Sequence, residues 1–471
     1  MKIQIRFLYQ LINWIAVLVF GLIIYEISTA SLKNISWIVL MFYLSATFIL
    51  LYRISKFLLT IKISDAQYLR LMLLSAFILR LYWIIAVDTK PFSDFALLLN
   101  TAKQFSDGDF SAFDIRYFHT FAYNIPFTIY EGIIYHLFHS VFVLKFINVL
   151  LSTSIVYFLY DILKQANKPD AGKIASFFAT IFPPFIIYTS VLTNQTISIF
   201  FSLMAISLYF KSRSLFLVGL VLGFAQLFRP TAVIYFIAII LLILLANLNN
   251  TNNHLQTLKK LSVSLFKLIT SYYLVLIIAS QLIIYSKVNN TGLFYNPTPS
   301  YKFLVGFNHQ TKGKYSVDDA ALLNDVDHFE KIAKQKIKER TKDKSKLVAL
   351  FFDKIKIFWG NNDASFFWAL TKNISNKGKY YSLKHPTQLL YFVFWFFAFI
   401  AVVFNLRNKK VDEIISLPVI VVLAFWLVYL FIEIQTRYRY EIYPMILILS
   451  SIGVLYLYRY FNDTYAVIND D

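Results

Sequence analysis

Apolar stretches close to the length of a membrane-spanning helix recur along the whole chain. A helix needs about 20 apolar residues to cross a bilayer, and twelve stretches of the 471-residue sequence approach that length. This pattern predicts an all-α polytopic membrane protein with about twelve transmembrane helices. The predicted spans are Phe7–Ile27, Trp37–Leu51, Leu71–Val87, Val141–Tyr160, Ile174–Val191, Ile197–Phe210, Leu215–Leu227, Ala232–Leu245, Leu265–Tyr285, Leu389–Phe404, Ile415–Phe431 and Glu441–Leu457.

The composition excludes several other classes of protein. Hydrophobic residues make up 58% of the chain and charged residues only 15%, which excludes a cytosolic enzyme and a disordered chain. The chain has no cysteine, so it has neither disulfides nor thiolate metal ligands. The first span could be a signal peptide cleaved near Ala30, but the apolar run at Trp37–Leu51 favours a retained anchor.

Two polar segments interrupt the apolar pattern and divide the chain into four regions. Residues 1–70 hold two N-terminal spans, and residues 71–286 form a transmembrane core that contains a first loop at 88–136. That loop mixes carboxylates with aromatic residues, so we expect short helices at the membrane surface. A second long loop covers residues 287–385, and residues 386–471 hold three more spans and a short tail.

The lysines and arginines indicate the orientation of the chain. They gather in alternate short loops, such as Arg53–Arg70, Lys164–Lys173 and Arg407–Lys410, which places these loops in the cytoplasm. We therefore predict a multi-pass protein of the cell membrane with both termini inside and both long loops outside. The turns at Arg229 and Arg437 fall on the same outer face, so we expect an extracytoplasmic site.

Asp94 is the carboxylate that we single out. It follows the third span directly, where an apolar interface would desolvate it and make it a stronger base. The alternative is that Ser93 or Asp94 caps a surface helix. Asp107 and Asp109 resemble a metal-binding DxD pair, but an Asp-Gly sequence is also an ordinary turn signal.

Four cations near span ends are candidate ligands for a phosphate. Arg229 ends one span and Lys145 begins another, and both could instead be interface anchors. Arg437 and Arg439 lie two residues apart in one turn and could grip a phosphate bidentately, or belong to an ion-pair network. The histidines have no metal-binding spacing.

The chain resembles the GT-C superfamily of integral-membrane glycosyltransferases, in particular the bacterial relatives of the dolichyl-phosphate-mannose protein mannosyltransferases. Four segments carry the resemblance, and they occur in the family's order across residues 70–460. They are Pro91–Asp94, Tyr123–Phe127 leading into Ile129–Phe138, Val218–Pro230, and Arg437–Tyr440 with Pro444.

The resemblance implies an inverting transferase that takes a sugar from a polyprenyl-phosphate donor at the outer face of the membrane. In that reading Asp94 is the catalytic base, and Arg229, Arg437, Arg439 and Lys145 hold the donor phosphate. His119, Tyr123 and Asn308 are candidate substrate contacts. The acceptor is a glycan, lipid or protein, with a cell-wall glycopolymer as one example. The resemblance implies no cofactor, no metal and no nucleic acid, and the remaining partners are membrane lipids.

Two other functions fit the same pattern of spans. A surface-polysaccharide polymerase or ligase also combines a large outer loop with arginines that handle lipid-linked sugars. A multi-span transporter or flippase has a similar number of helices, but it typically has shorter loops and charges in mid-span.

Overall fold

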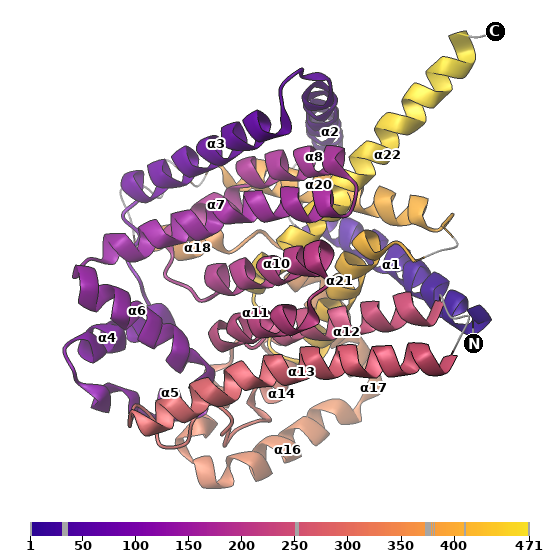
Figure 1. Ribbon diagram of the computed structural model, residues 1–471. Coiled ribbons are helices and arrows are strands. Elements are labelled where there is room, and N and C mark those ends of the chain that lie inside the picture. The colour runs from indigo at the N-terminus through magenta and orange to yellow at the C-terminus, as the bar shows by residue number, and fades with distance from the viewer. Residues whose placement is uncertain are drawn as a thin grey trace.

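The structure is a computed structural model that describes residues 2–30, 36–249, 254–372, 378, 380, 382–408 and 411–469. Within these residues every regular element is helical, as predicted (Figure 1). Residues 373–377, 379 and 381 of the predicted second loop lie outside the described part of the chain. The helices of the apolar bundle are α1 (Lys2–Ala30), α2 (Trp37–Thr60), α3 (Asp65–Ala86), α7 (Val141–Gln165), α8 (Pro169–Ile181), α10 (Gln195–Ser212), α11 (Leu215–Phe228), α12 (Ala232–Asn249), α13 (His254–Tyr285), α20 (Lys384–Asn405), α21 (Glu413–Phe431) and α22 (Tyr443–Asn469).

Short helices fill the two long loops and the breaks between bundle helices. The first loop contains α4 (Asp94–Ser106), η1 (Phe110–Phe113), α5 (Arg116–Thr120), η2 (Ala122–Asn124) and α6 (Ile125–Phe138). The second contains α14 (Tyr301–Gly306), α15 (Val317–Ala321), η4 (Leu322–Asn324), α16 (Val326–Lys342), α17 (Lys344–Ile355), η5 (Lys356–Gly360) and α18 (Ser365–Leu370). The remaining short elements are α9 (Pro183–Ile187), η3 (Tyr188–Ser190) and η6 (Thr436–Glu441).

Eight helices in the described residues are long and apolar enough to cross a membrane. The bent pair formed by α8 and the α9–η3 segment would make nine if it is one span. The three other predicted spans coincide with α10, α11 and α12, and α11 and α12 are shorter apolar helices. The chain is therefore a multi-pass membrane protein by composition, while the number twelve stays a prediction. The eight helices are α1, α2, α3, α7, α13, α20, α21 and α22.

The third predicted span starts earlier than its apolar run. We expected it at Leu71, but α3 begins at Asp65 because Ser64 and Gln67 form a capping box. The Gln67 amide N–H donates to the Ser64 hydroxyl at 3.3 Å, and the Ser64 N–H donates back to the Gln67 side chain at 3.0 Å. The predicted boundary at residue 70 therefore falls inside a helix.

A buried arginine supports the break between α8 and α9. Pro183 lacks the N–H that would donate to the Ala179 carbonyl, four residues earlier. Arg80 of α3 supplies that donor, from Nη2 at 3.0 Å, and its Nε donates to the Ser152 hydroxyl. Ser152 in turn donates to the Phe185 carbonyl at 2.6 Å. Arg80 thus satisfies the Ala179 carbonyl, which the proline leaves without a partner.

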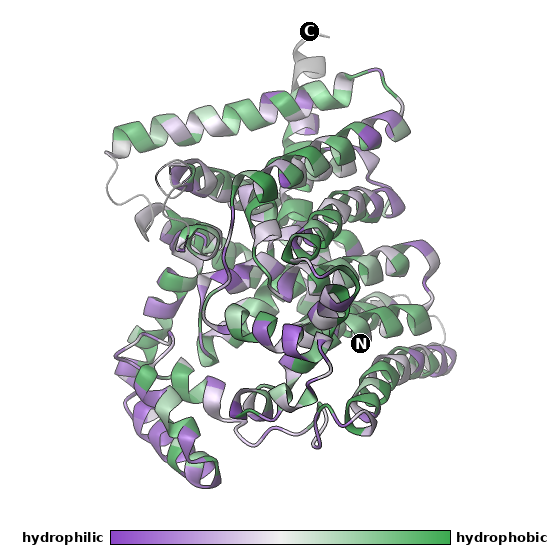
Figure 2. Cartoon of the chain, turned by 90° about the vertical axis from the view of Figure 1, so that its left-hand side faces the viewer, coloured by the Kyte–Doolittle hydropathy of each residue, from purple (hydrophilic) through white to green (hydrophobic). Residues whose placement is uncertain are grey.

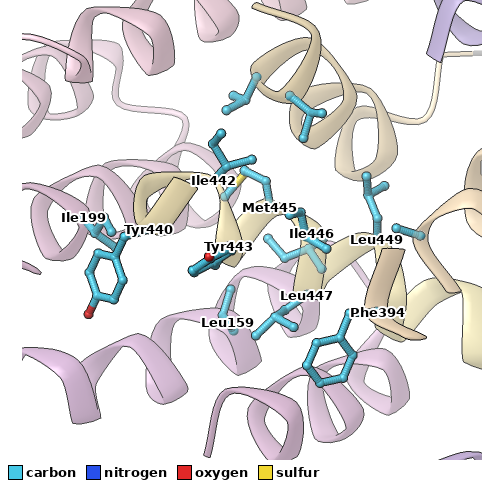
Figure 3. Close-up of a cluster of buried hydrophobic side chains, with 14 of the residues drawn as sticks. Leu159, Ile199, Phe394, Tyr440, Ile442, Tyr443, Met445, Ile446, Leu447 and Leu449 are labelled. Atoms are coloured by element: carbon cyan, nitrogen blue, oxygen red, sulfur yellow. The ribbon is translucent and has the colours of Figure 1, made fainter. Parts of the chain in front are cut away.

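The beginning of α22 enters the centre of the bundle. Figure 3 shows its buried side chains among residues of α7, α10 and α20. In Figure 1, α7 and α8 lie side by side, as do α11 and α13, and each pair is in contact. Hydrophobic residues run along most helices, while hydrophilic residues concentrate in loops and at helix ends (Figure 2).

The two long loops contact each other at one end of the bundle. The ring of Phe121 from the first loop lies 5.8 Å from that of Tyr301 in the second, measured between centroids. The segment that joins α21 to α22 meets both loops, because Lys302 pairs with Glu433 and Arg437 approaches Asp94. This end of the molecule holds the candidate site.

Candidate functional site

A cavity of about 850 Å³ opens where the two loops meet the α21–α22 connection. It is also lined by the start of α10 and by the turn between α11 and α12. Four cations and two carboxylates line it, so its charge favours an anionic ligand. These charged residues are Asp94, Arg116, Arg229, Lys302, Glu433 and Arg437. Tyrosines supply much of the remaining surface: Tyr117, Tyr123, Tyr301, Tyr315, Tyr429 and Tyr438.

Asp94 is the first residue of α4 and faces this cavity. Its side chain is 48% exposed and lines this open cavity. The capping alternative fails, because the cap residue Ser93 makes no side-chain cap hydrogen bond. Ser93 instead has a φ of 53°, a strained conformation of the kind found at functional sites.

Arg437 is the cation nearest to Asp94. Its Nη2 lies 3.9 Å from the Asp94 Oδ2, and the side chain is 10% exposed. The guanidinium lies 4.8 Å from the Trp368 ring centroid and 5.2 Å from that of Phe95. Its buried Nε has no hydrogen-bond partner among the described residues. A buried guanidinium with an unused donor is a ready-made contact for an anion.

The charge of Arg437 is maintained by its neighbours. Burial by itself would lower the pKa of Arg437, but Tyr438 and Asp94 outweigh burial and raise it. Gln195 at the start of α10 donates to the Arg437 carbonyl at 2.8 Å and fixes the backbone. Arg437 is therefore a charged and positioned group at the cavity wall.

Arg229 is held by a buried carboxylate. Its Nε pairs with Glu441, and its Nη1 donates to the Asn194 side chain at 2.9 Å. Glu441 also accepts hydrogen bonds from Thr231 and from Gln195. This network orients the guanidinium at the cavity and offsets part of its charge.

A chain of side-chain amides links Arg229 to the first loop. The Asn194 side chain donates to the side-chain oxygen Oδ1 of Asn124 at 3.4 Å, and the Asn124 side chain donates to the Tyr117 hydroxyl at 2.9 Å. Burial, followed by the charge of Asp94, raises the pKa of Tyr117, which therefore stays protonated. These hydrogen bonds connect the end of α11, the start of α10 and the first loop around one cavity.

Lys302 and Glu433 form a second ion pair in the cavity. Burial by itself would raise the pKa of Glu433, but Lys302 outweighs burial and lowers it. Burial would lower the pKa of Lys302, but Tyr438 and Glu433 raise it well above its usual range. Both groups are therefore charged, and Gln435 donates to the second Glu433 oxygen at 2.7 Å. No local sequence pattern points to Lys302, because its partner Glu433 lies far along the chain.

Lys354 fixes the second loop against the end of α21. Its ammonium is buried and donates to the carbonyls of Gly306 at 3.0 Å, Leu430 at 2.7 Å and Ile432 at 2.8 Å. These carbonyls lie at the C-terminal ends of α14 and α21, which a cation stabilises. We call Lys354 and these three carbonyls the clamp. It lies directly beside the Lys302–Glu433 pair, in which the Glu433 N–H also donates to the Lys302 carbonyl at 2.9 Å.

We expect Lys354→Met to destabilise the folded protein by on the order of 3 kcal/mol, because three buried carbonyls lose their donor. The measurement is the thermal unfolding midpoint in detergent. Lys346→Met is the matched control, since Lys346 is an exposed lysine of the same helix. Equal midpoints for both variants would show that the clamp contributes nothing.

Two of the predicted phosphate ligands do not reach the cavity. Arg439 is fully buried and donates to the Trp359 carbonyl at 2.9 Å, on the other side of η6 from Arg437. Lys145 donates to the Thr89 carbonyl at 2.8 Å and pairs with Asp88 at 3.7 Å. Neither residue lines the cavity, so neither is placed to bind a phosphate there.

Of the three predicted substrate contacts, one lines the cavity and two do not. Tyr123 lines the cavity, where burial raises the pKa of its hydroxyl. His119 lies outside the cavity lining. Asn308 is buried in the second loop, where it donates to Asp319 at 2.8 Å and accepts from the Thr311 N–H at 3.1 Å. It holds the loop together and does not face the cavity.

The Asp107–Asp109 pair lies at a turn away from the cavity. Asp109 accepts from the Ser111 N–H at 3.0 Å and caps η1. Within the described residues, no group of three or more His, Asp or Glu side chains is arranged to hold a metal. The turn interpretation therefore describes these carboxylates.

Glu131 on α6 is a buried carboxyl group that the cavity does not use. Neither of its oxygens has a hydrogen-bond partner among the described residues, and burial raises its pKa well above the usual 4.5. A folded-state pKa above the unfolded one stabilises the protein at low pH. That stability is lost as the pH rises from 4.5 through the folded pKa.

We expect Glu131→Gln to remove this pH dependence. Between about pH 5 and about pH 8 the unfolding midpoint of the unmodified protein should fall more than that of the variant. Glu339→Gln, on the exposed face of α16, is the control and should behave like the unmodified protein. Parallel pH curves for Glu131→Gln and the unmodified protein would contradict the assignment.

Comparison of the chain with models of protein families, with curated proteins and with solved structures finds no match. The site must therefore be interpreted from its own geometry. That geometry places a half-exposed carboxylate beside a buried arginine, with Arg229 and Lys302 in the same tyrosine-lined cavity.

Proposed function

We propose that the protein is a membrane glycosyltransferase that moves a sugar from a polyprenyl-phosphate donor to a hydroxyl group of an acceptor. The observation that carries this proposal is the pairing of Asp94 with Arg437 in one cavity, 3.9 Å apart. Glycosyl transfer to a hydroxyl needs a base for the proton and a cation for the departing phosphate.

Asp94 acts as the base in this proposal. The acceptor hydroxyl gives its proton to the Asp94 carboxylate as its oxygen forms a bond to the anomeric carbon of the sugar. The bond from that carbon to the phosphate oxygen breaks, and its electron pair leaves with the phosphate. Attack opposite to the leaving group inverts the anomeric configuration.

Arg437 stabilises the negative charge that develops on the phosphate, and Arg229 and Lys302 add to the positive field. Arg437 has an unused buried Nε and only a 3.9 Å contact with the half-exposed Asp94, whereas Arg229 and Lys302 each form a closer ion pair with a buried carboxylate. We therefore assign the direct phosphate contact to Arg437. The tyrosines of the cavity offer aromatic faces and hydroxyl groups to the sugar.

The proposal includes a GT-C-like arrangement of about twelve spans in the cell membrane, with the cavity on the extracytoplasmic side. Because the chain has no cysteine, single-cysteine variants test this orientation cleanly. Ser345→Cys, exposed in the second loop, should react with an impermeant thiol reagent in intact cells. Ser212→Cys, at the exposed C-terminal end of α10, should react only after lysis. The opposite pattern would overturn the orientation.

The activity is tested with purified protein in vesicles that contain polyprenyl-phosphate sugars and membrane extracts as the source of acceptor. We expect release of polyprenyl phosphate together with formation of a glycosylated product. A product that carries one added sugar supports the transferase. A ladder of longer products would instead identify a polysaccharide polymerase that uses the same groups.

A further inference from the structure

A second, smaller cavity lies on the other side of Arg437. Its volume is about 360 Å³, within the range of about 300–1,000 Å³ for small-molecule sites. Arg437 and Gln435 line both cavities, so these two side chains form the wall between them. The other contributions come from the segment around α18 and from the start of α20.

The smaller cavity contains hydrogen-bond acceptors that are held in place. Asp363 is buried, and its two oxygens accept hydrogen bonds from the Ser365 N–H at 2.7 Å and from the Tyr443 hydroxyl. A carboxylate has about four lone-pair positions, so two remain for a ligand. The Oδ1 atom of Asn362 is buried and has no hydrogen-bond partner among the described residues. Such an atom is costly unless a ligand or water satisfies it.

Aromatic side chains form another part of the wall. Trp368 stacks on Phe92 with centroids 4.8 Å apart, and the Arg437 guanidinium lies over the same tryptophan. Phe366 and Phe367 also line the cavity. The charged residues of the lining are Asp363, Lys384 and Arg437, so the choice of ligand rests on the acceptor oxygens and on the aromatic wall. The oxygens of Asn362 and Asp363 bind hydroxyl groups, and aromatic rings cover the apolar face of a sugar. The chemistry therefore suits a polyhydroxyl group.

We propose that the smaller cavity binds a sugar-sized polyhydroxyl group of the second substrate, and that Asn362 and Asp363 accept hydrogen bonds from it. This inference rests on the proposed function, since it places the acceptor opposite the donor phosphate across Arg437. A hydroxyl group that projects past Gln435 and Arg437 enters the larger cavity, where Asp94 lies.

The cysteine-free chain allows a direct test with Ala364→Cys, which lines the cavity, and with Asn361→Cys, which is exposed and lies outside the cavity lining. Both variants are labelled with a small polar thiol reagent in the presence of single monosaccharides, then in the presence of polyprenyl phosphate. We expect at least one monosaccharide, but not its epimers, to slow labelling of Cys at position 364 by about threefold when present at about twice its Kd. Labelling at position 361 should not change.

Polyprenyl phosphate separates this inference from the proposed function. It should bind the Ala364→Cys protein equally well before and after labelling, and it should not slow the labelling at position 364. Protection by polyprenyl phosphate, or by none of the sugars, would overturn the inference. Absence of polyprenyl-phosphate binding in the unmodified protein would instead overturn the proposed donor.

Discussion

Replacing Asp94 by asparagine is expected to abolish sugar transfer while the protein remains folded in the membrane. Asparagine keeps the size of the side chain but cannot take the proton of the acceptor hydroxyl. Removal of a general base costs about 10²–10⁴ in rate. Asp94 makes no cap hydrogen bond that the change could disturb, and its side chain is half exposed, so stability should hardly change. The rates of sugar transfer and the unfolding midpoints of Asp94→Asn and the unmodified protein check both expectations.

Two further variants sharpen this test. Asp94→Glu keeps the charge but displaces it by about a methylene, and a misplacement of about 1 Å can cost roughly a hundredfold. Asp107→Asn, in the same loop but outside the cavity, is the matched control and should be fully active. An Asp94→Asn protein that keeps more than about a tenth of normal turnover would exclude Asp94 as the base.

Replacing Arg437 by lysine is expected to lower turnover by about 10²–10³, the cost of removing one donor to a developing oxyanion. Lysine keeps the charge but loses the planar fork and the stacking on Trp368. Binding of polyprenyl phosphate should weaken in the same variant. Both quantities are measured with purified protein in vesicles.

Arg439→Lys is the matched control, two residues along the same turn. Arg439 lies outside the cavity and donates to the Trp359 carbonyl, so its replacement should lower the unfolding midpoint and leave donor binding unchanged. Normal turnover of Arg437→Lys would show that the phosphate contact lies elsewhere. Arg229→Lys should have an intermediate effect, because Glu441 shares that guanidinium.

The sequence predicts the helical class well, because apolar length is a local property. Each predicted span falls on a helix or, at Ile174–Val191, on the bent pair. The bend itself comes from Pro183 and Pro184, which the sequence shows, but its donor Arg80 lies 99 residues from the carbonyl that it satisfies. Local patterns carry no information about such a partner.

The sequence predicts only part of the candidate site, because local patterns do not identify partners that lie far apart in the chain. Loop order brings Asp94, Arg229 and Arg437 to one end of the bundle, and the cavity contains all three. Arg439 was wrongly grouped with Arg437, because η6 has about three residues per turn and residues two apart point in different directions. Lys302 and Lys354 were missed because their partners depend on how the second loop folds back onto α21.

The most direct measurement of sugar transfer follows a polyprenyl-phosphate sugar, labelled in the sugar, in vesicles that contain either the unmodified protein or Asp94→Asn. We predict that the unmodified protein transfers the label to an acceptor and releases polyprenyl phosphate, whereas Asp94→Asn binds the donor and transfers none. Equal consumption of donor by both proteins, or movement of the intact lipid across the bilayer without cleavage, would contradict this prediction.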